Sequence, residues 1–310
     1  MMSYLPEGFL INTKENNFYL SSIENFNRAL FENAPLEQRV SYCDCNHNLH
    51  IDFGFLHGVI PRDECALGIS DGTTRDIAII SRVNKPVRFI IKEIKEYSNK
   101  KIAVLSRVAV QKSFLNDYLP TISTGDIIDA RVTHLESFGV FCDIGCGVNA
   151  LLPIDNISIS RIPHPNARFS VGDDIKVIVK AFDDNGRVIL THKELLGTWE
   201  ENAAYFNVGE TVSGIIRSIE SYGIFVELTP NLSGLAEYTE GVSNGQQASV
   251  FIKSIIPEKM KFKLIIVDAF NAQYPRTKPQ YFIDSGHLDY FCYSPKNSCK
   301  NIITTFWFYL

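Results

Sequence analysis

The chain lacks the surplus of positive charge that proteins need when they hold nucleic acid mainly by bulk electrostatics. It has 30 Lys and Arg against 35 Asp and Glu, which gives a formal net charge of -5 over 310 residues. Binding that relies on phosphate neutralisation alone favours a basic protein. Any anion site in this chain must therefore be a local patch, or binding must depend on stacking.

Long hydrophobic runs are also missing. A membrane-spanning helix needs about 20 consecutive apolar residues, and no stretch of the sequence provides them. The first residues, MMSYLPEGFL, do not show the basic segment followed by an apolar core that marks a secretory signal. The seven cysteines are odd in number and lie scattered through segments with strand-like sequence patterns. These features predict reduced thiols, a cytoplasmic location and no membrane partner.

Common catalytic motifs are absent as well, since there is no Gly-rich phosphate loop, nucleophile elbow or HExxH sequence. The run CDCNHNLH from Cys43 to His50 offers zinc-type side chains. Structural zinc sites, however, usually join a C-x2-4-C pair to a distant second pair, so a strand and turn are the favoured interpretation. Cys142 and Cys146 are expected to be packing residues, because no helix N-terminus follows them. We expect no metal, no cofactor and no enzymatic activity.

What the sequence does contain is a repeat. Residues 136–145 read ESFGVFCDIG and residues 220–229 read ESYGIFVELT. Alternating apolar runs surround both phrases in the same order, and Asn185-Gly186 between two such runs is a strong hairpin signal. Each unit holds five short strands in about 65 residues, which predicts a small closed barrel of the OB type.

A third and more divergent copy lies upstream, in residues 37–110. Gly54 aligns with Gly145, and Pro61 aligns with Pro153. His47 and His50 then take the places of Phe138 and Phe141. We therefore predict a mostly β chain with three tandem five-stranded OB-type barrels, the first of them degenerate, joined by short helices.

Helical segments are expected before and between the barrels. Ser21-Ser-Ile-Glu24 has the pattern of a capping box, and Asp284-Ser-Gly286 has turn chemistry suited to a hairpin. The expected organisation is an N-terminal helical extension (1–36), the degenerate barrel (37–110), a second barrel (120–192), a linker helix (193–206), a third barrel (207–270) and a C-terminal hairpin or appendage (271–310).

The repeated phrase places aromatic rings where an OB barrel binds its ligands. Strict alternation would send Phe138 and Phe141 to opposite faces, so both are exposed only if the strand bends, which Gly139 permits. Exposed rings can stack on unpaired bases at about 1–3 kcal/mol per base. The alternative is that both rings belong to the core.

The phrases ESFGVFCDIG, NALLPIDNIS and RVILTHKE resemble the S1 RNA-binding domain, the OB module repeated in bacterial ribosomal protein S1. The resemblance covers residues 124–192 and 208–268 well and 37–110 weakly, and the whole chain resembles a clostridial-type family of S1-like proteins with tandem repeats. It implies that RNA is contacted by the ring pair, a following His, and an Asp and a basic residue near the last hairpin. The positions that match are Phe138, Phe141, Asp183 and Arg187 in the second barrel and Tyr222, Phe225 and Lys261 in the third.

This chain departs from that pattern in three places. Pro153 and Glu237 stand at the His position of the second and third barrels, and Pro257 replaces the Asp of the third. The second barrel is therefore the better candidate binder, and the first is expected to be structural or to contact proteins.

Local positive charge is concentrated in two places. The first barrel holds most of the bases, namely Arg82, Lys85, Arg88, Lys92, Lys95, Lys100 and Lys101. In the loop 160–168 of the second barrel, Arg161 and Arg168 are candidates to hold a phosphate. Alternatively, Arg168 is paired with a nearby acid in a rigid Pro-rich loop.

Together these features predict a non-enzymatic protein that binds single-stranded RNA, such as mRNA, with ribosome association and a role in translation as the expected context. One alternative is a protein–protein adaptor whose barrels have lost RNA affinity. Another is an accessory of an RNA-processing enzyme.

Overall fold

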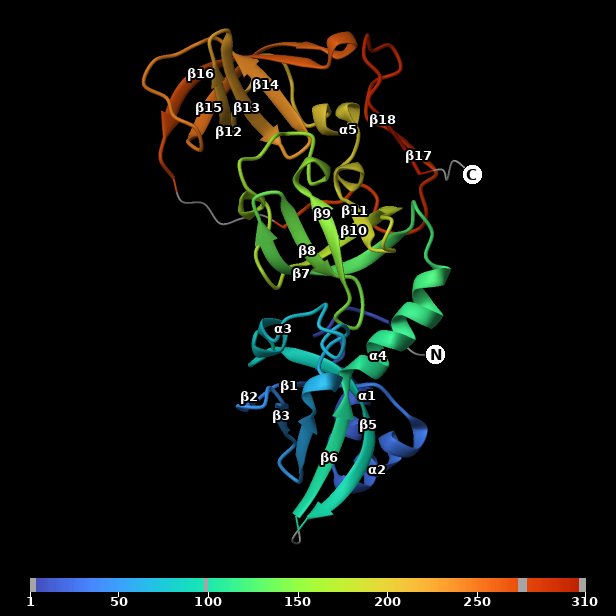
Figure 1. Ribbon diagram of the computed structural model, residues 1–310. Helices are drawn as coiled ribbons and strands as arrows, with labels where there is room; N and C mark the ends of the chain where they lie inside the picture. The colour runs from blue at the N-terminus through green and yellow to red at the C-terminus, as the bar shows by residue number, and fades with distance from the viewer. Residues whose placement is uncertain (1–3, 98–99, 273–277, 307–310) are drawn as a thin grey trace. The chain divides into compact units, whose positions relative to one another are not determined.

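The computed structural model describes residues 4–97, 100–272 and 278–306 of the chain. The chain forms two compact units. The first contains residues 1–122 together with 143–149, and the second contains residues 123–142 together with 150–310. Strands dominate both units (Figure 1).

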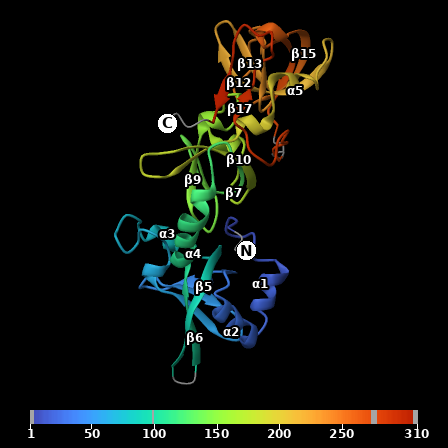
Figure 2. The same ribbon diagram turned by 90° about the vertical axis from the view of Figure 1, so that its right-hand side faces the viewer.

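The first unit begins with two helices, α1 (Lys14–Tyr19) and α2 (Ile23–Glu32). The cap of α2 is Ser22, whose hydroxyl accepts a hydrogen bond from the Asn25 backbone N–H at 3.2 Å. The capping box predicted at Ser21 is therefore wrong by one residue. Phe26 is fully buried, and α2 lies against one side of the sheet with this residue in the core (Figure 2).

The first unit holds one six-stranded sheet in the order β1-β5-β6-β4-β3-β2. Its strands are β1 (Leu36–Arg39), β2 (Tyr42–Cys43), β3 (Leu49–Asp52), β4 (His57–Ile60), β5 (Pro86–Tyr97) and β6 (Lys100–Ser106). The short helical segments η1 (Arg62–Glu64) and α3 (Ile77–Ile80) lie between β4 and β5. The five-stranded closed barrel predicted for this region is replaced by a curled sheet that does not close.

The reason is a break in the first strand. Strand β1 pairs with β5, whereas β2 pairs with β3. In the last barrel a single strand, β12, makes both kinds of pairing, with β15 through Thr211–Ile215 and with β13 through Ile215–Glu220. The segment between Arg39 and Tyr42 therefore interrupts one strand of an otherwise barrel-like order, and the sheet keeps two edges.

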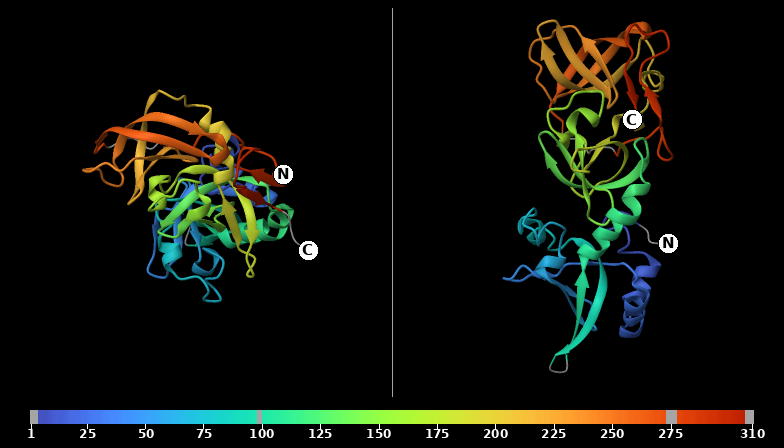
Figure 3. Two further views of the ribbon diagram at one scale, coloured as in Figure 1. Left: turned by 90° about the horizontal axis from the view of Figure 1, so that it is seen from above. Right: turned by 45° about the vertical axis from the view of Figure 1, so that its right-hand side comes forward.

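The second unit contains two closed five-stranded barrels, as predicted. One is formed by β7 (Ile127–Glu136), β8 (Gly139–Asp143), β9 (Asn149–Pro153), β10 (Asp174–Phe182) and β11 (Val188–Thr191). The other is formed by β12 (Thr211–Glu220), β13 (Gly223–Thr229), β14 (Leu232–Ala236), β15 (Gln247–Ile256) and β16 (Lys261–Phe270). Figure 3 shows the long strands of the last barrel from two directions.

Short helices occupy the connections, as the sequence predicted. The first unit ends in α4 (Arg107–Ser113), η2 (Phe114–Tyr118) and η3 (Leu119–Thr121). The barrel β7–β11 contains η4 (Ile154–Asn156) and η5 (Pro165–Ala167), and η6 (Lys193–Leu196) and α5 (Trp199–Ala203) lead to the last barrel, which contains η7 (Pro257–Lys259). Thr198 and Glu201 form a capping box at the start of α5.

The C-terminal segment forms a hairpin from β17 (Tyr290–Cys292) and β18 (Ile303–Thr305). Residues 284–286 precede this hairpin and do not form its turn, which lies between Cys292 and Ile303. Instead, the Gly286 carbonyl accepts a hydrogen bond from the Ile127 backbone N–H at the start of β7. Phe291 and Phe306 belong to the same buried core as the last barrel. Residues 273–277 and 307–310 of the predicted appendage lie outside the described residues.

Within the second unit, one buried side chain joins the two barrels and the linker between them. Asn231 is fully buried, and its amide donates to the carbonyls of Lys193 at 2.7 Å and Gly197 at 2.9 Å. Its side-chain oxygen accepts from the Ile159 backbone N–H at 3.1 Å. Every polar atom of the amide thus has a partner, as buried polar groups require.

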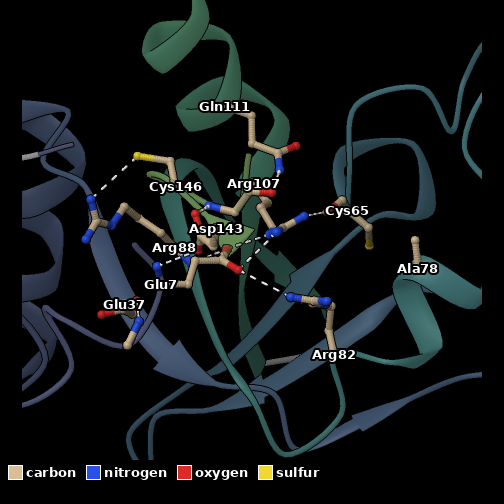
Figure 4. A network of polar contacts seen from close by, with 12 residues as sticks. Glu7, Glu37, Cys65, Ala78, Arg82, Arg88, Arg107, Gln111, Asp143 and Cys146 are labelled. Carbon is tan, nitrogen blue, oxygen red and sulfur yellow. Dashed lines mark hydrogen bonds and ion pairs between the residues drawn. The ribbon is translucent and has the colours of Figure 1, made fainter. Parts of the chain in front are cut away.

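A buried ionic network organises the first unit (Figure 4). The Glu7 carboxylate accepts from Arg107 Nε at 2.6 Å and Arg107 Nη2 at 2.9 Å, and Arg82 Nη1 lies 3.6 Å away. Burial alone would raise the pKa of Glu7, but the charge and hydrogen bonds of Arg107 outweigh burial and hold it below its usual value. Burial, with the nearby Glu7 charge, raises the pKa of Asp143 to about 6. The arginines are therefore structural partners of buried acids.

One buried histidine predicts a pH-dependent stability of the second unit. His192 is 1% exposed, and burial lowers its pKa from 6.5 to about 4. A depressed histidine pKa means that the folded state resists protonation, so its stabilising effect is complete above pH 6.5 and is lost as pH falls toward 4. We expect a loss of roughly 3 kcal/mol over that range from this group. The measurement compares the thermal unfolding midpoints of wild type and His192→Gln at pH values from 7 to 4. A variant with the same pH slope as wild type contradicts the prediction.

Candidate nucleic-acid interface

The ring pair of the second barrel lies at the start of β8. Phe138 occupies the turn before the strand and is 53% exposed, and Phe141 is half-buried. Val140, between them, is fully buried in the core. Because the strand begins only at Gly139, Phe138 escapes the alternation of β8, and no bulge within the strand is needed to bring both rings outside. Their centroids are 6.1 Å apart at an interplanar angle of 89°.

The last barrel repeats this geometry. Tyr222 precedes β13 and is 68% exposed, and Phe225 is half-buried. Their ring centroids are 6.2 Å apart at an interplanar angle of 88°. Both copies of the phrase therefore build the same edge-to-face pair, with one ring standing in solvent.

The glycine of the phrase is explained by the neighbouring strand. A Cβ on Gly139 would lie 2.5 Å from the carbonyl oxygen of Leu152, and a Cβ on Gly223 would lie 2.6 Å from that of Ala236. Both contacts are with backbone, which cannot move aside without disturbing the barrel. The glycine lets the third strand approach closely at the point where the first ring leaves the sheet.

In the last barrel, strand pairing adds a cation that sequence reasoning missed. Phe225 pairs with Leu235 on β14, and Leu235 pairs with Lys263 on β16. Cross-strand partners share a face, so the exposed Lys263 lies on the ring side of the barrel. Lys261, the residue inferred from the resemblance, is also exposed and pairs with Ile256. Residues 261–267 read KFKLIIV, and strand alternation puts Lys263 on the same face as Lys261. This alternation is the sequence signal that could have identified Lys263.

In the second barrel, the predicted hairpin residues lie together at the β10–β11 turn. The Asp183 carboxylate accepts from the backbone N–H groups of Asn185 at 2.9 Å and Arg187 at 2.8 Å. This is the turn chemistry expected of an Asp before Asn-Gly. Arg187 is exposed one residue before β11. Asp183 thus fixes the turn that presents Arg187.

The two loop arginines have different surroundings. Arg168 is paired with Glu227 on β13 at 2.5 Å, and Arg217 on β12 holds the same carboxylate at 2.8 Å. The Arg168 side chain is 10% exposed and that of Glu227 is 5% exposed. Burial lowers the pKa of Arg168, yet the ion pair satisfies its charge. Arg161 is exposed and lines a cavity of about 390 Å³ with Ser158 and Lys193.

Three of the seven bases named for the first unit are engaged with acids, and a fourth is buried. Arg82 belongs to the buried Glu7 network, and Arg88 is fully buried. Lys92 pairs with Glu64 at 2.5 Å, and Lys95 pairs with Glu93 at 2.7 Å. The basic composition of this segment therefore does not translate into a continuous cationic surface.

The cysteines of residues 43–50 differ in their exposure and form no disulfide. Cys45 is exposed, whereas Cys43 is half-buried, and Cys142 and Cys146 are both buried. Across residues 4–97, 100–272 and 278–306, no three His, Cys, Asp or Glu side chains are grouped so as to hold a metal ion. The same described residues contain no helix long and apolar enough to cross a membrane.

Glu237 directly follows β14, whose Ala236 pairs with Ile224 next to Phe225, and its removal is expected to increase RNA affinity. Its carboxylate is 78% exposed and lies 3.3 Å from Lys253 Nζ. The carboxylate repels phosphate and pairs with Lys253, which would otherwise be available to RNA. Glu237→His should therefore strengthen RNA binding about two- to tenfold and slightly raise its salt sensitivity. The measurement is anisotropy of fluorescent single-stranded RNA. Glu240→His, which changes another exposed acid, serves as control, and equal effects of the two substitutions contradict the prediction.

Comparisons with known proteins point to the S1 RNA binding domain and to the small ribosomal subunit protein bS1. The model of the S1 RNA binding domain matches residues 121–193. The small ribosomal subunit protein bS1 of Staphylococcus aureus (strain COL) is 30% identical over 281 residues, covering 85% of this chain and 68% of the relative. The protein of the same name from Staphylococcus epidermidis is 32% identical over 198 residues, covering 58% of this chain and 50% of the relative.

Among solved structures, this chain is similar to a multidomain protein with nucleic acid binding domains from Streptococcus pneumoniae. The sequence identity is 13% and the TM-score is 0.25, with 76% of this chain and 73% of that chain covered.

Proposed function

We propose that this chain, which belongs to the family of the small ribosomal subunit protein bS1, binds single-stranded RNA on the outer faces of its two closed barrels. The proposed contacts in the second barrel are Phe138, Phe141 and Arg187. In the last barrel they are Tyr222, Phe225 and Lys263, with Lys261 and the loop residue Arg161 as further cations.

The observation that carries the proposal is the repeated ring pair. Two separate barrels build the same edge-to-face geometry, at 6.1 and 6.2 Å, with the first ring more than half exposed in each. Burying these rings in the barrel interior would favour stability, so exposing them at the same point twice needs another cause. Stacking on unpaired bases supplies one.

The charge of the chain shapes how this binding responds to salt. The chain has a net charge of -5, and the proposed contacts include only four cations, so it neutralises few phosphates. Stacking therefore contributes most of the affinity, which makes binding sequence-tolerant and only moderately salt-dependent. In this interpretation Asp183 acts by holding the turn and Arg168 by holding Glu227, and neither contacts RNA directly.

The biological setting follows from the relatives. Their name places them in the small ribosomal subunit, and we extend to this chain a role in translation, in the cytoplasm, with mRNA as the ligand. It acts as a binding protein and not as a catalyst.

The test is a titration of fluorescent oligouridine with the full chain at two salt concentrations, with a perfectly paired duplex of the same length as control. We expect binding to the single strand, weak binding to the duplex and a shallow salt dependence. An absence of binding at both salt concentrations overturns the proposal and favours the adaptor alternative.

A further inference from the structure

The first unit has no Phe or Tyr at the ring positions of the repeat, but strand pairing shows which residue replaces one of them. In the last barrel, Phe225 pairs with Ser218 on one side and with Leu235 on the other. In the first unit, His50 pairs with Tyr42 on one side and with Val59 on the other. His50 thus occupies the same position between its two neighbouring strands that Phe225 occupies in the last barrel.

The rest of the row agrees. In the last barrel, Leu235 pairs with Lys263, which pairs with Ser254 beside a bulge of β15. In the first unit, Val59 pairs with Val104, which pairs with Glu93 beside a bulge of β5. His50 therefore lies on the face of the first sheet that corresponds to the ring face of the barrels. The difference is Tyr42, which stands where the last barrel has the small Ser218.

Tyr42 covers His50. The two rings are stacked with centroids 4.3 Å apart and an interplanar angle of 4°. Tyr42 remains 49% exposed, whereas the His50 side chain is 13% exposed. The aromatic surface that faces solvent on this sheet is therefore the phenol ring of Tyr42.

His50 is itself held in place by hydrogen bonds on both ring nitrogens. Its Nδ1 lies 2.8 Å from His57 Nε2, and its Nε2 lies 3.0 Å from Asp44 Oδ2. Asp44 is in turn fixed by the backbone N–H groups of Asn46 at 2.9 Å and Asn48 at 2.8 Å. The imidazole nitrogens are directed at each other and at the acid, so this group is built to hold a ring and not a metal ion.

The open face of Tyr42 follows from these contacts. His57 is joined edge to edge with His50, and its plane is within 24° of the Tyr42 plane, so both imidazoles lie under the same face of the phenol. Among the described residues, Tyr42 makes no other ring contact. A ring that is already stacked and fixed on one face can receive a flat ligand on the other without rearrangement, which reduces the entropic cost of binding.

We propose that Tyr42, supported by His50 and His57, is a third base-stacking site, at which the first unit binds one unpaired nucleobase of single-stranded RNA. This inference rests on the proposed function of the two closed barrels. It adds a contact in the part of the chain that the family model does not match.

Oligouridine binding by the full chain, with the ring pairs of the closed barrels removed, tests this site. The background variant carries Phe138→Ala, Phe141→Ala, Tyr222→Ala and Phe225→Ala. In this background, Tyr42→Ala should weaken binding to an oligouridine of about 30 nucleotides at low salt by roughly tenfold. Tyr42→Phe should stay within about twofold, because a phenyl ring stacks as well.

The matched control is Phe31→Ala. Phe31 is 92% exposed on α2 of the same unit, and it makes no ring contact among the described residues. It should leave affinity unchanged. Ultraviolet cross-linking of wild type to the same RNA should also yield a cross-linked peptide that contains Tyr42.

Equal effects of Tyr42→Ala and Phe31→Ala on affinity, with no cross-link at Tyr42, overturn the third site. If the wild-type chain still binds oligouridine in that case, the proposed function of the closed barrels stands. Wild-type chain that fails to bind oligouridine overturns both.

Discussion

Replacing Phe138 and Phe141 together by alanine should weaken binding of single-stranded RNA by roughly 10- to 100-fold while moving the thermal midpoint by only a few degrees. Each stacked base contributes about 1–3 kcal/mol, and the tyrosine–phenylalanine pair of the last barrel remains to hold part of the RNA. Phe138 is 53% exposed and Phe141 is half-buried, so their truncation removes little of the core. Anisotropy gives the affinity, and calorimetry gives the midpoint.

Val140 provides the matched control within the same phrase. It lies between the two phenylalanines in the sequence and is fully buried in the core, so Val140→Ala should cost about 1–2 kcal/mol of stability and leave the RNA affinity of the folded chain nearly unchanged. The opposite pattern, in which the ring variant unfolds and the valine variant loses RNA, would show that the rings are core residues.

Replacing Glu7 by glutamine should destabilise the first unit by about 3–5 kcal/mol, which is the usual cost of leaving a buried charge without its partner. The Arg107 side chain is 4% exposed and is held by both Glu7 oxygens, and Arg82 lies against the same carboxylate. The neutral amide of glutamine cannot compensate the positive charge of either arginine. Urea unfolding of the full chain, followed by probes in each compact unit, measures the effect separately for the first unit.

An exposed ion pair in the same unit serves as control. Glu32 on α2 accepts from Arg28 at 2.7 Å, with the Arg28 side chain 60% exposed. Glu32→Gln should leave the unfolding midpoint of the first unit nearly unchanged, because solvent screens such pairs. Similar midpoints for Glu7→Gln and Glu32→Gln would mean that the Glu7 network does not stabilise the first unit.

The prediction of the two closed barrels from sequence succeeded because its signals are local. Alternating apolar residues, the Asn185-Gly186 turn and the repeated glycine act over a few neighbouring residues, and they determine strand, turn and face directly. The same locality explains the linker helix that begins after Thr198. The capping prediction at Ser21 missed by one residue, since two adjacent serines offer the same hydroxyl and only helix geometry chooses between them.

The first sheet shows the limit of this reasoning. Its strand order could be anticipated from the alignment of Pro61 and His50, but the break between Arg39 and Tyr42 could not. Whether one strand continues across both neighbours depends on how β5 and β3 approach it from opposite sides, and no local pattern encodes that approach. The sheet therefore stays open although its composition resembles that of a barrel.

The sequence by itself determined that this chain is built from repeated β units with aromatic phrases at equivalent positions, because periodicity and turn chemistry are properties of adjacent residues. Only the tertiary structure decided which charges and rings are available. Arg168 and Arg88 are indistinguishable from free cations in the sequence, yet one is neutralised by Glu227 and the other is fully buried. Lys263 and Tyr42 reach the ring faces because strands far apart in the sequence pair in a particular register, and register is fixed by the packing of the whole sheet.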